Sequence, residues 1–303
     1  MPDGQIVISG LTKQYKQVRA VDDLSFTVES GRVTGFLGPN GAGKTTTLRM
    51  LLNLVTPTAG TATIGGHRYA DLTDPIRTVG AILEASAAHS GRTGRNHLRV
   101  ICEVNGFPAS RADEVLDLVG LTPAAKRKFK GYSLGMRQRL GIAAALLGDP
   151  GVLILDEPAN GLDPEGIRWM RELLRGLAGQ GRTILVSSHL LSEMEQLADD
   201  VVIIAAGRLI RQGPLDEVIG AMSTDAQVRV RTPEPEKLTA ALAEIGATVT
   251  PRGDGGLLVT GAEAAAIGDA AHAAGVPLHE LATQRPDLED VFLELTQGKA
   301  AIR

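Results

Sequence analysis

The stretch GRVTGFLGPNGAGKTTTLRMLLNLV, residues 31–55, decides the fold because its three parts differ sharply in composition. Residues 33–37 form a short apolar run, which predicts a buried strand, and the glycine-rich residues 38–43 predict a loop. Apolar residues then recur at helical spacing, which predicts a helix from Lys44 to Leu54. The apolar stripe of this helix consists of Leu48, Leu51, Leu52 and Val55. The stretch therefore predicts a strand, a loop and a helix in direct succession.

The loop has the spacing of a phosphate-binding motif, Gly38-x4-Gly43-Lys44-Thr45. Glycines let the backbone curl until successive N–H groups point at phosphate oxygens, and the following helix adds its positive end. Lys44 would neutralise the β- and γ-phosphates of a nucleotide, and the Thr45 hydroxyl would bind Mg²⁺. A glycine-rich turn could match by accident, but the strand before it and the helix after it favour a nucleotide site. The expected phosphate cradle consists of Gly38, Pro39, Asn40, Gly41, Ala42, Gly43, Lys44, Thr45 and Thr46.

Two adjacent carboxylates stand in the segment PGVLILDEPANGLDPEG, residues 150–166. The aliphatic run from Val152 to Leu155 predicts a central parallel strand, which Pro158 ends. Ligands of α/β sheets bind at the carboxyl ends of the strands, so both carboxylates should face the phosphate loop. We predict that Asp156 holds Mg²⁺ and that Glu157 accepts a proton from the attacking water. The alternative, a solvated strand end, is disfavoured by the phosphate loop.

A second aliphatic strand is predicted from Thr183 to Val186, and it ends in the sequence Ser-Ser-His. A lone histidine is usually a satisfied surface or core residue. His189, however, occupies the carboxyl end of a strand, as Asp156 does, so we predict a contact to the γ-phosphate.

The segment GYSLGMRQRLGIAAALL, residues 131–147, changes character halfway along. Its second half predicts a helix with one buried face, formed by Leu140, Ala143, Ala144 and Leu147. Its first half is small and polar. Ser133 could be a helix N-cap, with Gly131 and Gly135 marking the bend, and taken alone the segment favours this interpretation.

Charge and composition limit the classes of partner. The net charge is −4, divided into +1 for residues 1–220 and −5 for residues 221–303. Neither part has the basic excess of a protein that grips nucleic acid by charge, so we expect no nucleic-acid partner. With 303 residues and 43% hydrophobic residues, the chain can form one large domain and a smaller one.

The sequence predicts no segment that enters a membrane. Residues 1–10 lack a basic start and an apolar core, so we expect no signal peptide. Apolar runs such as residues 140–147 and 201–206 are too short to cross a bilayer. The single cysteine, Cys102, excludes an internal disulfide and a multi-cysteine zinc site. We therefore expect a cytoplasmic protein that contacts a membrane only through a partner.

Five motifs occur in a fixed order along the chain: GPNGAGKTT, YSLGM, LILDEP, NGLD and SSH. In their order and spacing, over about residues 4–220, the chain resembles the ATP-binding subunit of an ABC transporter. That family names these motifs the Walker A loop, the signature loop, the Walker B strand, the D-loop and the switch histidine. The resemblance implies an α/β fold of the P-loop NTPase type for residues 1–220, with a helical subdomain at about residues 86–150.

The resemblance also implies roles for residues already singled out. ATP and Mg²⁺ would be the cofactors, with Thr45 and Asp156 at the metal and Lys44, Glu157 and His189 as catalytic groups. Tyr15 falls where the family places an aromatic ring stacked on adenine. A tyrosine buried in a strand is the alternative interpretation at that position.

The signature loop would complete the site of another subunit. In the family, this loop meets the γ-phosphate held by the opposite subunit, which implies that Ser133 and Gly135 bind ATP and that efficient hydrolysis needs a dimer. Leu134 and Met136 stand where the family has glycine and glutamine. The sequence leaves open whether these two changes weaken the binding of the γ-phosphate.

The Q-loop also departs from the family pattern. Ala85 aligns with the glutamine that the family uses to touch Mg²⁺ and to signal to the membrane partner, and Glu84 stands one residue before it. Either Glu84 substitutes for that glutamine or the contact is missing.

Within the family, the chain looks most like the bacterial exporters of the bacitracin and daunorubicin resistance type. This resemblance implies an ATPase that powers drug or antibiotic export through a separately encoded transmembrane permease, at the inner face of the cell membrane. The chain would pair with a second copy or with a related ATPase. Two alternatives remain, a soluble ABC protein without a transport role and a regulator that binds ATP but hydrolyses it weakly.

Residues 221–303 differ from the preceding part in their sequence pattern, which predicts a small α+β domain. Their strands and helices follow a β-α-β-β-α-β order, which is typical of a ferredoxin-like fold. No residues there have ligand or catalytic spacing. An accessory role, as a dimer contact or in packing on the ATPase domain, is favoured over small-molecule sensing. The expected elements cover residues 227–232, 235–246, 247–260, 262–275, 276–283 and 288–296.

Overall fold

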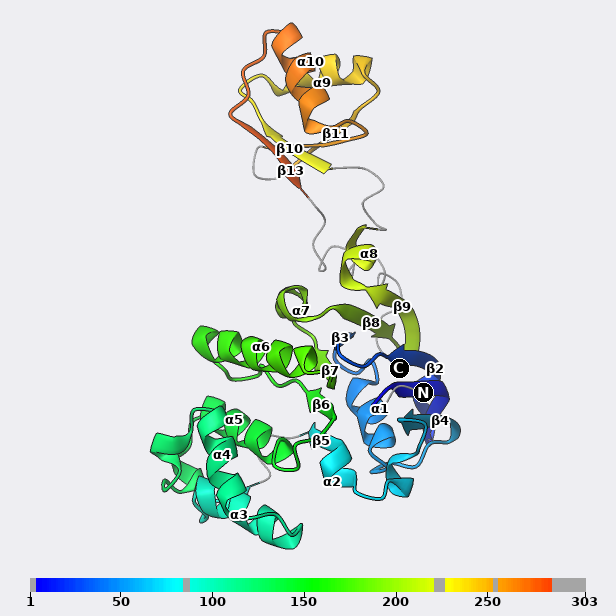
Figure 1. Ribbon diagram of the computed structural model, residues 1–303. Helices are drawn as coiled ribbons and strands as arrows, with labels where there is room; N and C mark the ends of the chain where they lie inside the picture. Colours follow the sequence, from blue (N-terminus) through cyan, green and yellow to red (C-terminus); the bar gives the residue numbers. More distant parts are fainter. Residues whose placement is uncertain (1–3, 84–87, 221–226, 253–255, 285–303) are drawn as a thin grey trace. The chain divides into compact units, whose positions relative to one another are not determined.

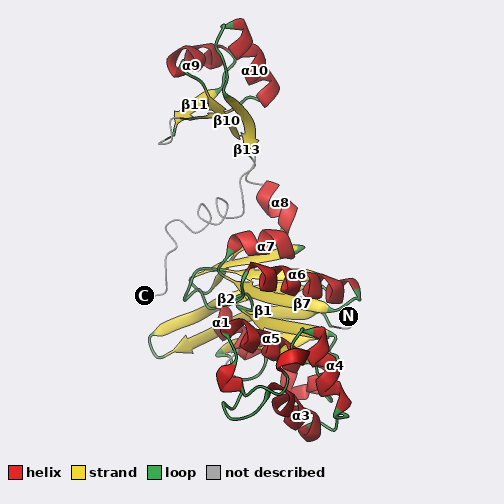
Figure 2. Cartoon of the chain, turned by 90° about the vertical axis from the view of Figure 1, so that its left-hand side faces the viewer, coloured by secondary structure: helices red, strands yellow, loops and turns green. Residues whose placement is uncertain are grey.

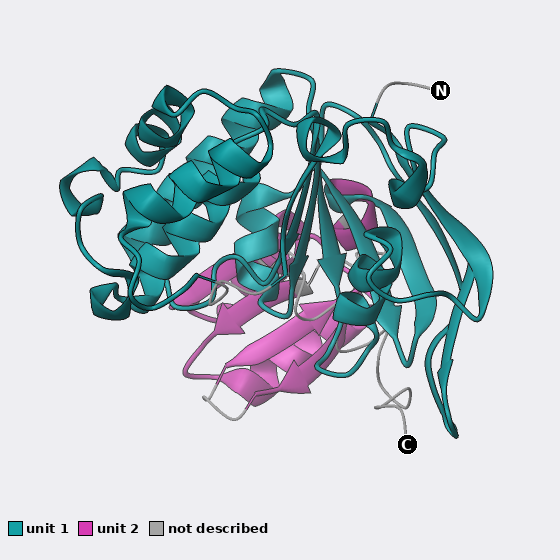
Figure 3. Cartoon of the chain, turned by 90° about the horizontal axis from the view of Figure 1, so that it is seen from below, with its two compact units in different colours: residues 1–215, 295–303 teal, residues 216–294 magenta. Residues whose placement is uncertain are grey.

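The structure is a computed structural model that describes residues 4–83, 88–220, 227–252 and 256–284. Its described residues divide into two compact units, one up to residue 215 and one that starts at residue 216 (Figure 3). Each unit has its own hydrophobic core, so each is described separately. No helix of the described residues is long and apolar enough to cross a bilayer.

A six-stranded sheet in the order β5-β6-β7-β3-β8-β9 forms the centre of the first unit (Figure 1). The first five strands in this order are parallel and β9 is antiparallel. Every residue of β3, β6 and β7 is buried, as expected for central strands covered on both faces. The strands are β3 (Val33–Leu37), β5 (Val79–Ile82), β6 (Val152–Asp156), β7 (Thr183–Ser188), β8 (Asp200–Ala205) and β9 (Arg208–Pro214).

A second, antiparallel sheet packs against the central one with helix α1 (Lys44–Leu51) in the same core. Its strand order is β2-β1-β4, with β1 (Ile6–Tyr15), β2 (Val18–Val28) and β4 (Ala59–Ile64). Phe36 of β3 points into this core, where its ring lies 5.2 Å from that of Phe26. Its neighbour Gly35 faces the other side of the sheet, against Met194. The central sheet is therefore covered on both faces.

Helix α1 is shorter than predicted. It ends at Leu51 rather than Leu54 because Asn53 takes a left-handed conformation, with φ +57°, that a helix cannot continue. The predicted stripe is still partly correct, since Leu48, Leu51 and Leu52 are buried.

Three helices form a separate group at the β5 edge of the sheet (Figures 1 and 2). They are α3 (Gly94–Val104), α4 (Ser110–Leu118) and α5 (Leu134–Ala145), and each contacts the other two. Ser133 caps α5 by accepting a hydrogen bond from the Met136 N–H at 3.2 Å, as the cap interpretation predicts. Helix α5 stops at Ala145, so Leu147 of the predicted buried face lies beyond it. The other helical segments of this unit are α2 (Pro75–Thr78), α6 (Pro164–Gly179), α7 (Leu191–Leu197) and the short turns 69–71, 122–124 and 129–131.

The second unit starts at the second residue of α8 (Leu215–Gly220) and contains a four-stranded antiparallel sheet in the order β11-β12-β10-β13. Its elements follow the β-α-β-β-α-β order of a ferredoxin-like fold. The last strand starts at Glu280 rather than at the predicted Val276, since Pro277 lacks the N–H that a ladder needs. The predicted helix 288–296 and the tip of the predicted hairpin lie outside the described residues. The elements are β10 (Gln227–Arg231), α9 (Pro235–Glu244), β11 (Thr248–Pro251), β12 (Leu257–Thr260), α10 (Ala264–Ala273) and β13 (Glu280–Gln284).

Candidate active site

The glycine-rich loop between β3 and α1 forms a small pocket. Gly41 and Gly43 have φ of +81° and +104°, and a side chain at Gly43 would clash with the Ala20 carbonyl. Glycine is therefore required there by both conformation and space. Lys44 Nζ donates to the Gly38 carbonyl at 2.6 Å, which folds the side chain back over the loop. The pocket has a volume of about 240 Å³ and is lined by Ala20, Pro39, Asn40, Gly41, Ala42, Gly43, Lys44, Thr45, Thr46 and Glu157.

The carboxylate of Asp156 is fixed between two hydroxyl groups at the end of β6. The Thr45 hydroxyl donates to Asp156 Oδ2 at 2.7 Å, and the Ser187 hydroxyl donates to Oδ1. Because β6 and β7 are parallel and in register, Ser187 lies directly beside Asp156. Both carboxylate oxygens therefore have a defined donor, and the group cannot turn away from the loop.

Glu157 leaves the strand in a left-handed conformation, with φ +49°. Its N–H donates to the Ser187 carbonyl and hydroxyl at 3.2 and 3.1 Å. The carboxylate lies 3.5 Å from Lys44 Nζ and 2.8 Å from His189 Nδ1. The backbone turn thus aims Glu157 at different partners from those of Asp156, one residue earlier.

The structure brings five of the predicted site residues together: Lys44, Thr45, Asp156, Glu157 and His189. It does so because β3, β6 and β7 are neighbours whose carboxyl ends lie at one edge of the sheet. The longest of these contacts, between Lys44 and Glu157, joins residues that are 113 positions apart in the sequence.

Three predicted nucleotide contacts lie elsewhere. Ser133 and Gly135 stand at the start of α5. Neither belongs to the described residues that line the phosphate pocket. Tyr15 ends β1 with 44% of its surface exposed, so it is not a buried strand residue. Its ring has Lys13 Nζ 4.9 Å from its centroid. Glu84 and Ala85 lie outside the described residues.

The start of α5 packs against the D-loop. Gly161 has φ +80°, and a side chain there would clash with Leu134. A side chain at Gly135 would approach the Gly161 carbonyl within 3.3 Å. Leu134, which departs from the family pattern, is therefore in contact with the D-loop of its own chain.

Sequence reasoning missed two residues that hold the carboxylates in place. The sequence predicts Ser187 only as part of a strand end, although it binds Asp156 and the Glu157 N–H. Gln138 has no predicted role, although its side chain is buried and donates to the Glu157 carbonyl. The available signal was a polar residue on the apolar stripe that continues through Ile142 and Ala145.

A third carboxyl group, that of Glu193, stands in the first turn of α7, close enough to Glu157 and His189 to interact with their charges. Its Oε2 atom is buried and has no hydrogen-bond partner among the residues that the structure describes. Burial raises the pKa of Glu193, the Glu157 carboxylate raises it further, and His189 lowers it. Ionised Glu193 is therefore costly in the folded protein.

We expect Glu193→Gln to raise the Tm by about 1–2 °C near pH 8 and by less near pH 5. Because the pKa of Glu193 is raised by folding, the neutral acid contributes its full stability at a pH below the pKa of the unfolded state. That contribution is lost as the pH rises through the pKa of the folded state. Thermal unfolding at both pH values measures this, with exposed Glu172→Gln as the control. A larger rise at the lower pH would contradict this account.

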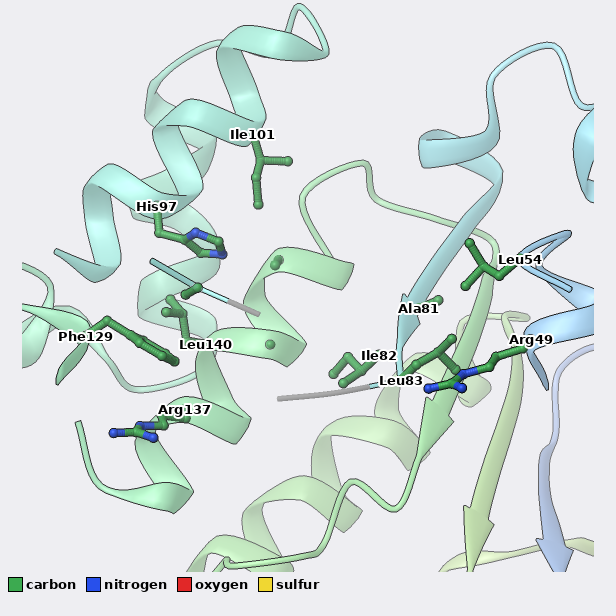
Figure 4. Close-up of a pocket in the computed structure, with 13 residues that line it drawn as sticks. Arg49, Leu54, Ala81, Ile82, Leu83, His97, Ile101, Phe129, Arg137 and Leu140 are labelled. Atoms are coloured by element: carbon green, nitrogen blue, oxygen red, sulfur yellow. The ribbon is translucent and has the colours of Figure 1, made fainter. Parts of the chain in front are cut away.

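A separate apolar groove of about 450 Å³ lies between the sheet edge and the helical group (Figure 4). On one side are Arg49 and Leu54, which follow the phosphate loop, together with Ile82 and Leu83 at the end of β5. The opposite side is lined by His97, Ile101, Phe129, Arg137 and Leu140. Burial lowers the pKa of His97, and Arg92 lowers it further, so this wall favours a neutral imidazole.

Comparison with known proteins identifies the family. A family model described as ABC transporter matches residues 21–160, and a model described as a domain of unknown function (DUF8746) matches residues 226–289. The bacitracin transport ATP-binding protein BcrA of Bacillus licheniformis is 46% identical over 216 residues, or 70% of this chain and 71% of that protein. The daunorubicin resistance ATP-binding protein DrrA3 of Streptomyces coeruleorubidus is 37% identical over 98% of this chain and 97% of its own length.

Solved structures agree with these relatives. One described as an ATP-binding subunit of an ABC transporter is 29% identical, with a TM-score of 0.65 over 72% of this chain and 93% of that one. The dimeric structure of MJ0796, a bacterial ABC transporter cassette, has the same fold, with 24% identity and a TM-score of 0.64 over 69% of this chain and 98% of that one. The resemblance drawn from the five motifs is thereby confirmed. The chain belongs to the ATP-binding proteins of ABC transporters, and it is an ATPase.

Proposed function

We propose that Glu157 is the general base of ATP hydrolysis in this chain. One observation carries the proposal: Glu157 lines the phosphate pocket, and its carboxylate lies between Lys44 Nζ and His189 Nδ1. A base must reach the proton it removes, and this carboxylate is aimed at the space where the γ-phosphate would lie.

Lys44 and His189 would act on charge rather than on the proton. Lys44 is buried and already lies beside the pocket, so its ammonium group would stabilise charge that develops on the phosphate. His189 binds Glu157 through Nδ1, which fixes the ring and leaves its other nitrogen to face the γ-phosphate. In-line attack by a water held at Glu157 would then release phosphate.

Thr45 and Asp156 suit Mg²⁺. Thr45 lines the pocket, and its hydroxyl meets the Asp156 carboxylate at 2.7 Å, so the two side chains could offer oxygen ligands to one ion. Among the described residues no group of three acidic, histidine or cysteine side chains could hold a metal alone, which agrees with an ion shared with substrate phosphates. When bound, the ion would neutralise phosphate charge. Ser187 would keep Asp156 oriented toward it.

The site would be completed by a second copy of the chain. Ser133 and Gly135 lie away from their own phosphate pocket, at the positive N-terminal end of α5. We propose that they bind the γ-phosphate held by the partner and that Tyr15, half exposed, stacks on adenine. Residues 221–303 would add contacts between copies as an accessory domain.

We further propose that the ATPase powers export of a drug or antibiotic through a separate transmembrane permease. Support comes from the relatives, whose names refer to bacitracin transport and daunorubicin resistance. The apolar groove beside the phosphate-loop helix would receive a cytoplasmic segment of the permease (Figure 4). Such a contact would place this protein at the inner face of the membrane and link the permease to α1.

The groove can be tested with Leu54→Glu. Leu54 is 65% exposed and lines the groove, so a charge there should block an apolar partner without disturbing the fold. We expect at least tenfold less integral membrane protein to co-purify from solubilised membranes, with ATPase activity unchanged. Leu118→Glu, at an exposed leucine of α4 outside the groove, is the matched control. Equal recovery with both variants would argue against this docking site, and absence of any membrane partner with the wild type would favour a soluble ABC ATPase.

A further inference from the structure

Gln138 is a buried amide on the helix that begins at the signature loop. Its residue surface is only 3% exposed, and it lies on the same helical stripe as Ile142 and Ala145. The side-chain Nε2 donates to the carbonyl oxygen of Glu157 at 3.4 Å. A buried amide is costly unless it has a polar partner, so the contact accounts for a polar side chain at this core position.

The backbone of Glu157 is held from three elements. The Glu157 N–H donates to Ser187 of β7. The Glu157 carbonyl accepts from the Gln138 side chain of α5 and from the Asn160 N–H, the latter at 3.2 Å. A residue with a side chain rarely keeps a φ of +49° unless its surroundings enforce it. This conformation is what turns the Glu157 carboxylate from the direction of Asp156 toward Lys44 and His189.

The same helix also contacts the D-loop. Leu134 and Gly135, in its first turn, pack against Gly161, four residues after Glu157. Gln138 lies one turn further along the helix. A displacement of the start of α5 would therefore reach Glu157 by two routes, the D-loop and the Gln138 amide.

We propose that Gln138 is a positioning residue: its amide holds the Glu157 peptide so that the carboxylate stays between Lys44 and His189, and it ties the catalytic base to the helix that carries the signature loop. The inference rests on the role of Glu157 proposed above. It adds a residue outside the lining of the phosphate pocket that sets the orientation of the general base.

Gln138→Met tests the proposal because methionine has a similar length and volume but cannot donate. We expect kcat for ATP hydrolysis to fall about fivefold, the usual effect of one lost hydrogen bond, with KM for ATP and the Tm unchanged. Gln180→Met, at an exposed glutamine that follows α6, is the matched control and should behave as the wild type. A purely structural role would instead lower the Tm and impair nucleotide binding together with kcat.

A double variant separates this inference from the proposal beneath it. If Gln138 acts through Glu157, adding Gln138→Met to Glu157→Gln should cause no further loss of kcat. Two results would overturn the inference alone, provided that Glu157→Gln itself is slow. One is a wild-type kcat in Gln138→Met, and the other is a further fivefold loss of kcat in the double variant. Near-normal turnover in Glu157→Gln contradicts the general base, and the inference falls with it.

Discussion

Glu157→Gln is expected to slow steady-state ATP hydrolysis by about 100-fold or more while ATP still binds. Glutamine keeps the shape of the side chain and can still contact His189, but it cannot accept the proton of the attacking water. The carboxylate also lies 3.5 Å from Lys44 Nζ, so its neutralisation removes a negative charge from the pocket, which should retain ATP. The expected signature is a loss in kcat with little change in affinity.

Phosphate release at saturating ATP measures kcat, and equilibrium binding of a fluorescent ATP analogue measures the affinity. Glu165→Gln, at an exposed glutamate in the first turn of α6, is the matched control and should hydrolyse ATP normally. Turnover of Glu157→Gln within a few-fold of the wild type would remove Glu157 from the role of base.

Lys44→Ala is expected to weaken nucleotide binding itself, by about 10- to 100-fold in Kd. The Lys44 side chain is buried, with Nζ 2.6 Å from the Gly38 carbonyl and close to Glu157. Its removal takes one positive charge from the pocket and leaves Glu157 facing the phosphates without that neighbour. Repulsion between the carboxylate and the nucleotide adds to the lost attraction.

The affinity of Lys44→Ala for ATP can be compared with that of Lys126→Ala, at an exposed lysine between α4 and α5. The combination Lys44→Ala with Glu157→Gln should recover part of the affinity, because it removes the carboxylate that Lys44 no longer neutralises. Tight ATP binding by Lys44→Ala alone would contradict the phosphate-loop interpretation.

Local pattern was enough to predict the parts of the site that belong to single segments. The strand at residues 33–37 and the loop that follows it were predicted with their bounds, because glycine spacing and an apolar run are local signals. Asp156 and Glu157 were placed at the end of a buried strand for the same reason, and the structure has that strand over Val152–Asp156. The strand order then brings their side chains to Lys44 and Thr45.

What sequence could not supply was the backbone conformation and the contacts between distant segments. Nothing in the sequence indicates that Glu157 takes a left-handed turn, since glutamate has no preference for it. The contacts of Gln138 with Glu157 and of Leu134 with Gly161 depend on how α5 packs, which helical periodicity alone does not fix. The early end of α1 was missed because helical spacing continues past Asn53.

The most direct test of the central claim, a composite site completed by a second copy, is the molar mass of Glu157→Gln with and without Mg·ATP, measured by light scattering. The account predicts one chain mass without nucleotide and twice that mass with ATP, because the trapped ATP joins Lys44 of one copy to Ser133 and Gly135 of the other. The added substitution Ser133→Arg should prevent the increase without preventing ATP binding. A Glu157→Gln protein that binds ATP and keeps the mass of a single chain would contradict the claim.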